Sequence, residues 1–370
     1  MMALAAQMQR VAAAAKKSPM QIMMEYGRLA KGPGKISPSD YIELRLFDDE
    51  WCKEGDRAMF VGKRRNRDIC FEANYRRDWL GVLQNKILSQ SYLNAFGLPV
   101  IPIKAIYAPG SRRSGTLLSD RADIEGFLKR ADVYPLFGKP AEGSNSLGSI
   151  ALVATDGTRV EKTDGERLPI EKLAADIIEN YESGYLFQEL IAPHAEVATV
   201  CGRRIASVRF LTIASRSGVQ TIRAAWKIPA GANVADNYWR EGNLLASIDP
   251  SNGRVKRVTS GSGVDAKQHE AHPDTGTRLI GVEHPQWQEM CAVALDGARL
   301  MRSVPLIGWD IACTEHGPMI IEMNEYPDFF LMQFAEGRGL LDEEFADFLD
   351  FQKQRGAAFQ KKMNSTFATF

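Results

Sequence analysis

This chain of 370 residues lacks the features that mark several large classes of protein. Its 46 basic residues equal its 46 acidic ones, so no overall field favours nucleic acid or an anionic membrane. No apolar run reaches the roughly 18 residues of a membrane span, and the Ala- and Met-rich start does not resemble a secretory signal. The five cysteines form no CxxC pair, which favours reduced thiols and a cytoplasmic protein over a disulfide framework.

Two familiar binding patterns are also missing. No GxxxxGK[ST] occurs, which excludes a P-loop, and Gly261-Ser-Gly-Val-Asp-Ala266 imitates a dinucleotide fingerprint without a following helix. His269 and His272 form an HxxH in a Pro/Gly-rich loop, where no third ligand is evident. The sequence therefore predicts no zinc site.

Residues 1–95 have a mainly helical pattern. Ser37-Pro38-Ser39-Asp40 is a start signal for a helix. Apolar residues at helical spacing predict another helix over Trp79–Phe96, ended by Gly97. The apolar faces of these helices make the region a candidate for docking or dimerisation, and it contains no recognisable site.

Strands and helices alternate irregularly after residue 95, which predicts an α+β fold. We expect one subdomain over residues 96–187, a second over 188–350, and a C-terminal tail over 351–370, whose last dozen residues are loosely held. Val197–Val200 reads as a strand, and a last helix is expected over Glu343–Gly356.

The most informative segment runs from Ile307 to Asn324. Two apolar stretches flank Glu315-His-Gly-Pro318, which predicts a β-hairpin. Asp310, Glu322 and Asn324 place oxygen-bearing side chains inside these strands. Oxygen ligands are those that Mg²⁺ prefers, although such residues can also be paired polar groups of an edge strand. Glu322 and Asn324 share a face, whereas the register of Asp310 cannot be read from the sequence.

A second segment joins a lysine to a flexible loop. Lys139 ends one predicted strand, and Glu142-Gly-Ser-Asn-Ser-Leu-Gly148 follows it. Such a lysine offers a point charge to phosphates, and the amides of the loop can close over them. A plain hairpin with a surface lysine is the alternative.

Cations also occur within predicted strands of the second subdomain. Arg209 lies in Ser207-Val-Arg-Phe210, and Lys227 follows Trp226. A cation inside a strand can line an anion pocket or form an ordinary ion pair.

Together these segments resemble the ATP-grasp superfamily, in particular its sugar-transfer-associated or α-L-glutamate-ligase-like branch. The resemblance covers about residues 80–335, with weaker similarity back to Ser37–Tyr41. It implies two α+β subdomains that clasp ATP behind a helical N-terminal region. It also implies ATP contacts by Lys86, Lys139, Glu142, Ser144, Ser146, Gln188, Glu189, Leu190, Ile191 and Asn237; Mg²⁺ ligation by Asp310, Glu322 and Asn324; and catalytic roles for Arg209 and Lys227.

The resemblance implies a ligase. Such enzymes activate a small-molecule carboxylate as an acyl phosphate and couple it to an amine or another nucleophile, and the name of the branch suggests a polysaccharide or sugar-related pathway. Two positions depart from the pattern: Gly308 replaces a common arginine, and Asp328 replaces the glycine of Glu-x-Asn-x-x-Pro-Gly. A kinase that phosphorylates the hydroxyl of a polyol or sugar is therefore the alternative. Asn237 and Arg240 are candidates for substrate contact.

Overall fold

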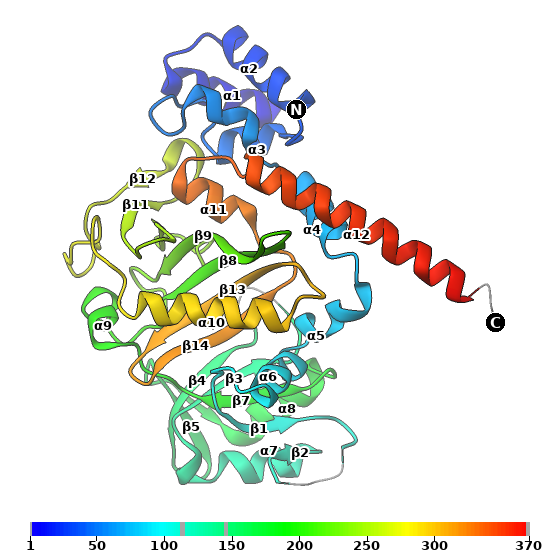
Figure 1. Ribbon diagram of the computed structural model, residues 1–370. Helices are drawn as coiled ribbons and strands as arrows, with labels where there is room; N and C mark the ends of the chain where they lie inside the picture. The colour runs from blue at the N-terminus through cyan, green and yellow to red at the C-terminus, as the bar shows by residue number, and fades with distance from the viewer. Residues whose placement is uncertain (1, 112–114, 144–146, 368–370) are drawn as a thin grey trace.

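Two seven-stranded sheets form the centre of the chain, with helices around them (Figure 1). This computed structural model describes residues 2–111, 115–143 and 147–367. The strand order is β2-β1-β7-β3-β4-β5-β6 in the first sheet and β12-β11-β10-β9-β8-β13-β14 in the second. The expected α+β class is confirmed.

The N-terminal region is helical up to Ala95, as expected. In α3, Ser37 Oγ accepts the Asp40 backbone N–H at 3.1 Å, and Asp40 Oδ2 accepts the Ser37 N–H at 2.9 Å. This reciprocal capping box satisfies two donors that the helix leaves unpaired. The helices of the region are α1 (Met2–Ala15), α2 (Pro19–Lys31), α3 (Pro38–Glu43), α4 (Lys63–Ala73), α5 (Leu80–Gln84) and α6 (Lys86–Ala95).

The helix predicted over Trp79–Phe96 is in fact two helices. Asn85 adopts an extended conformation between α5 and α6, and its Oδ1 accepts the backbone N–H groups of Ile87 at 3.0 Å and Leu88 at 3.1 Å. Asparagine favours this N-cap role over the interior of a helix. The break makes Lys86 the first residue of α6.

The first sheet carries two helices, α7 and α8. Its strands are β1 (Ile103–Tyr107), β2 (Leu117–Leu118), β3 (Leu136–Pro140), β4 (Ile150–Thr155), β5 (Arg159–Lys162), β6 (Arg167–Pro169) and β7 (Tyr185–Glu189), and its helices are α7 (Arg121–Leu128) and α8 (Ile170–Asn180). β3 and β4 pair in antiparallel fashion, so the hairpin predicted around Lys139 is confirmed.

The second sheet is covered on both faces. Along β8, Val208 and Phe210 pack in one apolar cluster, and Leu211 and Ile213 pack in the other. α10 contributes to the first cluster and α11 to the second. The strands are β8 (Ser207–Ser215), β9 (Gly218–Ile228), β10 (Leu244–Ile248), β11 (Val255–Ser260), β12 (Lys267–Gln268), β13 (Leu306–Thr314) and β14 (Gly317–Asn324), and the helices are α9 (Ala195–Cys201), α10 (Trp287–Leu300), α11 (Phe329–Glu336) and α12 (Glu343–Phe367).

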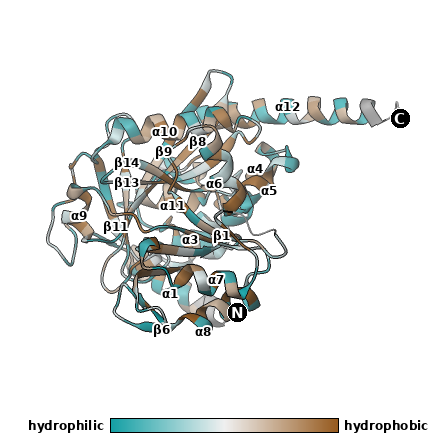
Figure 2. Cartoon of the chain, turned by 90° about the horizontal axis from the view of Figure 1, so that it is seen from below, coloured by the Kyte–Doolittle hydropathy of each residue, from teal (hydrophilic) through white to brown (hydrophobic). Residues whose placement is uncertain are grey.

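Two further expectations from sequence were wrong. Val197–Val200 is not a strand but part of α9, where Val197 and Cys201 lie one turn apart and are both buried; tertiary packing here overrides the strand preference of valine. The last helix does not end at Gly356 but continues as α12 to Phe367. Its far end extends beyond the rest of the chain (Figures 1 and 2).

Buried and aromatic side chains hold α12 against the rest of the chain as far as Phe359. Gln352 is fully buried and donates to the Ala214 carbonyl at 2.7 Å. Phe359 packs against Tyr75, with ring centroids 5.7 Å apart. Within the described ranges, none of the helices is both long and apolar enough to cross a membrane.

Candidate functional site

The hairpin β13–β14 carries the predicted oxygen ligands. Asp310 pairs directly with Glu322, and Gly308 pairs with Asn324. The register shifts between Asp310 and Ile311. The predicted hairpin is therefore confirmed, and the structure supplies the register that the sequence left open.

Two cations from the neighbouring strands bind Asp310. Arg209 lies opposite Asp310 across the β8–β13 pair, and its Nη2 donates to Asp310 Oδ2 at 2.7 Å while its Nε donates to Oδ1. Lys227 Nζ, from β9, lies 3.0 Å from the same Oδ2. Burial alone raises the pKa of Asp310, but the charges of Arg209 and Lys227 hold that pKa well below its usual range.

A second carboxylate, Asp236, completes this cluster. It lies 3.5 Å from Lys227 Nζ, and its Oδ2 accepts the Ser207 backbone N–H at 2.9 Å. Two buried cations thus face two carboxylates. The role of Asp236 was missed from sequence because it lies in a loop; its place directly before Asn237 was the available signal.

Two lysines reach the hairpin from the side of the first sheet. Lys139, on β3, is buried, and its Nζ lies 3.4 Å from the Ile321 carbonyl on β14. Burial lowers the pKa of Lys139 to about 8, which the nearby Glu322 opposes and Lys86 reinforces. Lys86 Nζ lies 3.8 Å from Glu322 Oε1 and donates to the Gly143 carbonyl at 2.7 Å. The two lysines and the carboxylate of Glu322 therefore lie together beside β14.

The loop after β3 is anchored beside Lys86. Glu142 Oε1 accepts Asn85 Nδ2 at 3.4 Å, and its Oε2 accepts Ser183 Oγ at 3.1 Å. Ser144 and Ser146, predicted to contact ATP, lie outside the described residues.

Residues 188–191, which are predicted to contact ATP, lie at the end of β7 and directly after it. The side chain of Gln188 is fully buried, and its Nε2 donates to the Ile101 carbonyl at 3.1 Å. Glu189, Leu190 and Ile191 are half-buried, and Glu189 lies 3.6 Å from Lys104 Nζ. Residues 189–191, rather than the Gln188 side chain, are thus the accessible part of this segment.

The oxygen donors of the hairpin are of the kinds that Mg²⁺ binds, and one of them, Asp310, is also paired with Arg209 and Lys227. Two carboxylates face each other across the strand pair, and Asn324 follows two residues after Glu322. Asn324 Nδ2 donates to the Gly308 carbonyl at 3.4 Å, which fixes which side of the amide presents oxygen. Carboxylate and amide oxygens are suited to Mg²⁺.

The two departures from the family pattern have structural reasons. A Cβ at Gly308 would lie 2.9 Å from Pro327 Cβ and 3.1 Å from Arg209 Cδ, so Arg209 and Pro327 occupy the space beside this glycine. Asp328 instead begins α11, where its Oδ1 accepts the Phe330 N–H at 3.0 Å. Burial raises the pKa of Asp328.

The loop proposed for substrate contact is internally ordered. Asn237 Oδ1 accepts the Trp239 N–H at 3.1 Å, and the Asn237 carbonyl accepts the Arg240 N–H at 3.0 Å and Asn243 Nδ2 at 2.7 Å. Asp236 links this loop to Lys227. The loop therefore lies against the Arg209–Asp310–Lys227 cluster.

Comparisons with known proteins give one family. A family model described as sugar-transfer associated ATP-grasp matches residues 64–346. No curated protein sequence matches the chain.

Several solved structures are similar at low identity. The D-alanine-D-alanine ligase from Coxiella burnetii is 13% identical, with a TM-score of 0.45, over 78% of this chain and 62% of that one. The ADP complex of purK, an N5-carboxyaminoimidazole ribonucleotide synthetase, is 14% identical, with a TM-score of 0.39, over 69% and 50%. The ATP-grasp ligase PsnB, complexed with a phosphomimetic variant of its minimal precursor, Mg and ADP, is 16% identical, with a TM-score of 0.39, over 75% and 60%. The chain spans less than two thirds of the length of each.

Proposed function

This chain belongs to the sugar-transfer-associated ATP-grasp family, and from that premise we propose that it is an ATP- and Mg²⁺-dependent ligase. It activates a carboxylate as an acyl phosphate and couples it to an amine or another nucleophile. The observation that carries the proposal is the meeting of Lys86 and Lys139 with Glu322 beside β14. Opposite charges that converge between β3, α6 and β14 suit a polyphosphate with its cation.

Each group of residues has a separate role in this proposal. Lys86 and Lys139 hold phosphate oxygens as point charges. Residues 189–191 border the base, and Glu142 lies beside the phosphates. Asn237 contacts the nucleotide or the substrate from its ordered loop. Arg209 and Lys227 stabilise the transferring phosphoryl group, because fixed charges act strongly where water is excluded.

Asp310, Glu322 and Asn324 would hold Mg²⁺, which supplies charge neutralisation to the phosphate oxygens when bound. Arg209 and Lys227 already bind both oxygens of Asp310. The depressed pKa of Asp310 keeps this ligand ionised at any working pH.

The proposed reaction has two steps. A carboxylate oxygen of the substrate attacks the γ-phosphorus, and the bond from that phosphorus to the β-bridging oxygen breaks, so that ADP leaves. The nucleophile then attacks the acyl carbon and inorganic phosphate leaves, while the nucleophile loses a proton to solvent. Exclusion of water from the site protects the acyl phosphate between the steps.

The pathway and the compartment belong to the same proposal. The family description favours a sugar-related or polysaccharide pathway. All five cysteines are free thiols, which supports a reducing compartment such as the cytoplasm.

The alternative to the ligase is a kinase, whose product would be a phosphorylated hydroxyl of a polyol or sugar. Gly308 favours this kinase alternative, because the family's common arginine is missing there. Arg209 lies against the same position and places a cation there instead, so we give preference to the ligase.

Product analysis tests the proposal. The full chain is incubated with Mg·ATP and a panel of amino acids, sugar acids and polyols, and phosphorus NMR follows the products. We expect ADP and free phosphate only when an acid and a nucleophile are both present. Glu322→Gln with Asn324→Ala should abolish this turnover, whereas Glu315→Gln, in the exposed turn of the same hairpin, should leave it unchanged. Phosphate that stays on a polyol would identify a kinase and overturn the ligase proposal.

A further inference from the structure

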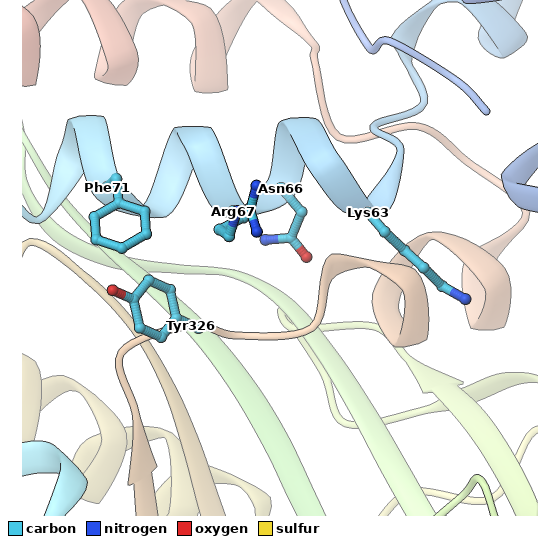
Figure 3. A pocket seen from close by; sticks show the side chains of 5 residues that line it. All are labelled: Lys63, Asn66, Arg67, Phe71 and Tyr326. Atoms are coloured by element: carbon cyan, nitrogen blue, oxygen red, sulfur yellow. The ribbon is translucent and has the colours of Figure 1, made fainter.

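A pocket lies between the N-terminal region and the segment that follows β14, and none of the residues proposed to bind ATP lines it. Its volume is 340 Å³, and Lys63, Asn66, Arg67, Phe71 and Tyr326 line it (Figure 3). Four of these residues come from α4, and Tyr326 comes from the segment between β14 and α11. None of them has a role in the proposed ATP site.

The pocket is tied to the candidate metal site. Asn66 Nδ2 donates to the Pro327 carbonyl at 3.1 Å, and its Oδ1 accepts the Phe329 N–H at 3.1 Å. This pair of bonds fixes α4 against the segment. Tyr326 lies two residues after Asn324, so their Cα atoms are at most about 7 Å apart. A substrate whose reacting group lies at the hairpin can therefore reach the pocket with another part.

Two aromatic rings form one side of the pocket. Phe71 and Tyr326 face each other with ring centroids 5.1 Å apart and an interplanar angle of 54° (Figure 3). Phe71 is 38% exposed, so part of its ring is open to a ligand. Arg77 stacks on Phe71 with its Cζ 4.0 Å from the ring centroid, which holds the ring in place.

Cations form the other side. Lys63 and Arg67 lie four residues apart on α4, so they point to the same side of the helix. Lys63 Nζ forms an ion pair with Glu43 Oε2 at 2.5 Å. Arg67 has no hydrogen-bond or ion-pair partner in the part of the chain that the structure describes. An unpaired guanidinium presents N–H donors in a fixed planar geometry, and two of them can donate to the oxygens of one carboxylate or phosphate.

We propose that this pocket binds an anionic, ring-bearing substrate of the ligase, and this inference rests on the proposed function. The acid group, a carboxylate or a phosphate, pairs with Arg67 and is supported by Lys63. The face of the ring packs against Phe71 and Tyr326. The pocket thereby recognises the part of the substrate that does not react.

Calorimetric binding to the full chain without nucleotide tests the pocket by itself. The probes are glucuronate, a glucose phosphate and neutral glucose. We expect at least one anionic probe to bind and glucose not to bind. Arg67→Gln should weaken that binding about tenfold or more, the range for loss of a charged hydrogen bond, and Phe71→Leu should weaken it by a smaller factor.

Arg64→Gln is the matched control. Arg64 is an exposed arginine on the same helix that does not line the pocket, so its loss should leave binding unchanged. If no anionic probe binds, if glucose binds equally well, or if both arginine variants behave alike, the inference is wrong. The preference between glucuronate and the phosphate identifies the acid group.

The inference and the proposed function fail separately. Binding that depends on Arg67 in a chain that never forms ADP would contradict only the ligase. If the ligase turns over, Arg67→Gln should raise KM for the ring-bearing substrate and leave KM for ATP unchanged. An unchanged KM for both would contradict only the pocket.

Discussion

Replacing Asp310 by asparagine is expected to destabilise the fold by about 3–5 kcal/mol, the range for breaking a buried ion pair. Asp310 is 4% exposed, and its partners Arg209 and Lys227 are 9% and 7% exposed. Without the carboxylate charge, Arg209 would lose its ion-pair partner, and Lys227 would keep only the longer ion pair with Asp236. A single domain has only about 5–15 kcal/mol of stability, so the loss would be a large share of the total.

Urea unfolding followed by tryptophan fluorescence measures this loss. Trp309, the neighbour of Asp310 in β13, is fully buried and donates to Thr212 Oγ1 at 2.9 Å, so unfolding exposes its ring to water and changes its emission. Glu315→Gln is the control, because exposed substitutions usually change stability by less than about 0.5 kcal/mol. Adding Arg209→Met to Asp310→Asn should cost less than the sum of the single changes, since one uncompensated cation is removed.

The contribution of Asp310 to the free energy of unfolding should depend on pH. The folded-state pKa of Asp310 lies below its unfolded value of about 3.9. Its stabilisation is therefore complete above that unfolded value and is lost as the pH falls through the folded pKa. A destabilisation by Asp310→Asn of less than about 1 kcal/mol, or an unchanged acid-unfolding midpoint, would refute this account of the cluster.

Three further predictions concern the candidate site. Burial lowers the pKa of Lys139 to about 8, so its side chain is charged below that pH and neutral above it. Calorimetry should therefore show the affinity for ATP falling as the pH rises through about 8. Lys139→Arg should remove that fall, because arginine stays charged. Asn85→Ala should cost about 1 kcal/mol by loss of the α6 cap and raise KM for ATP by displacing Lys86, as thermal melts and kinetics would show. Gly308→Ala should cost about 1–3 kcal/mol in urea unfolding, because its Cβ would meet Pro327 and Arg209.

Local signals in the sequence predicted the elements that carry the site. The hairpin of residues 307–324 could be read because apolar strands flank a turn, and β13 and β14 form it. The start of α3 could be read from Ser37 and Asp40 because a capping box depends on neighbouring residues alone.

The contacts within the site could not be read in this way. Arg209 and Asp310 are 101 residues apart, and Lys227 and Asp310 are 83 apart, so only the order of strands in the sheet brings them together. The shift in register after Asp310 follows from packing across the hairpin. The short helix α9 was predicted as a strand, because over so few residues the strand preference of valine outweighs the signal of helical spacing.

Transfer of labelled oxygen tests the acyl phosphate most directly. An acid substrate identified by the product analysis is labelled with ¹⁸O in its carboxylate and turned over with Mg·ATP and the nucleophile. The account predicts that one labelled oxygen moves into the released phosphate, because the bond between that oxygen and the acyl carbon breaks when the nucleophile attacks. Turnover that leaves the phosphate unlabelled would contradict activation of the carboxylate at this site.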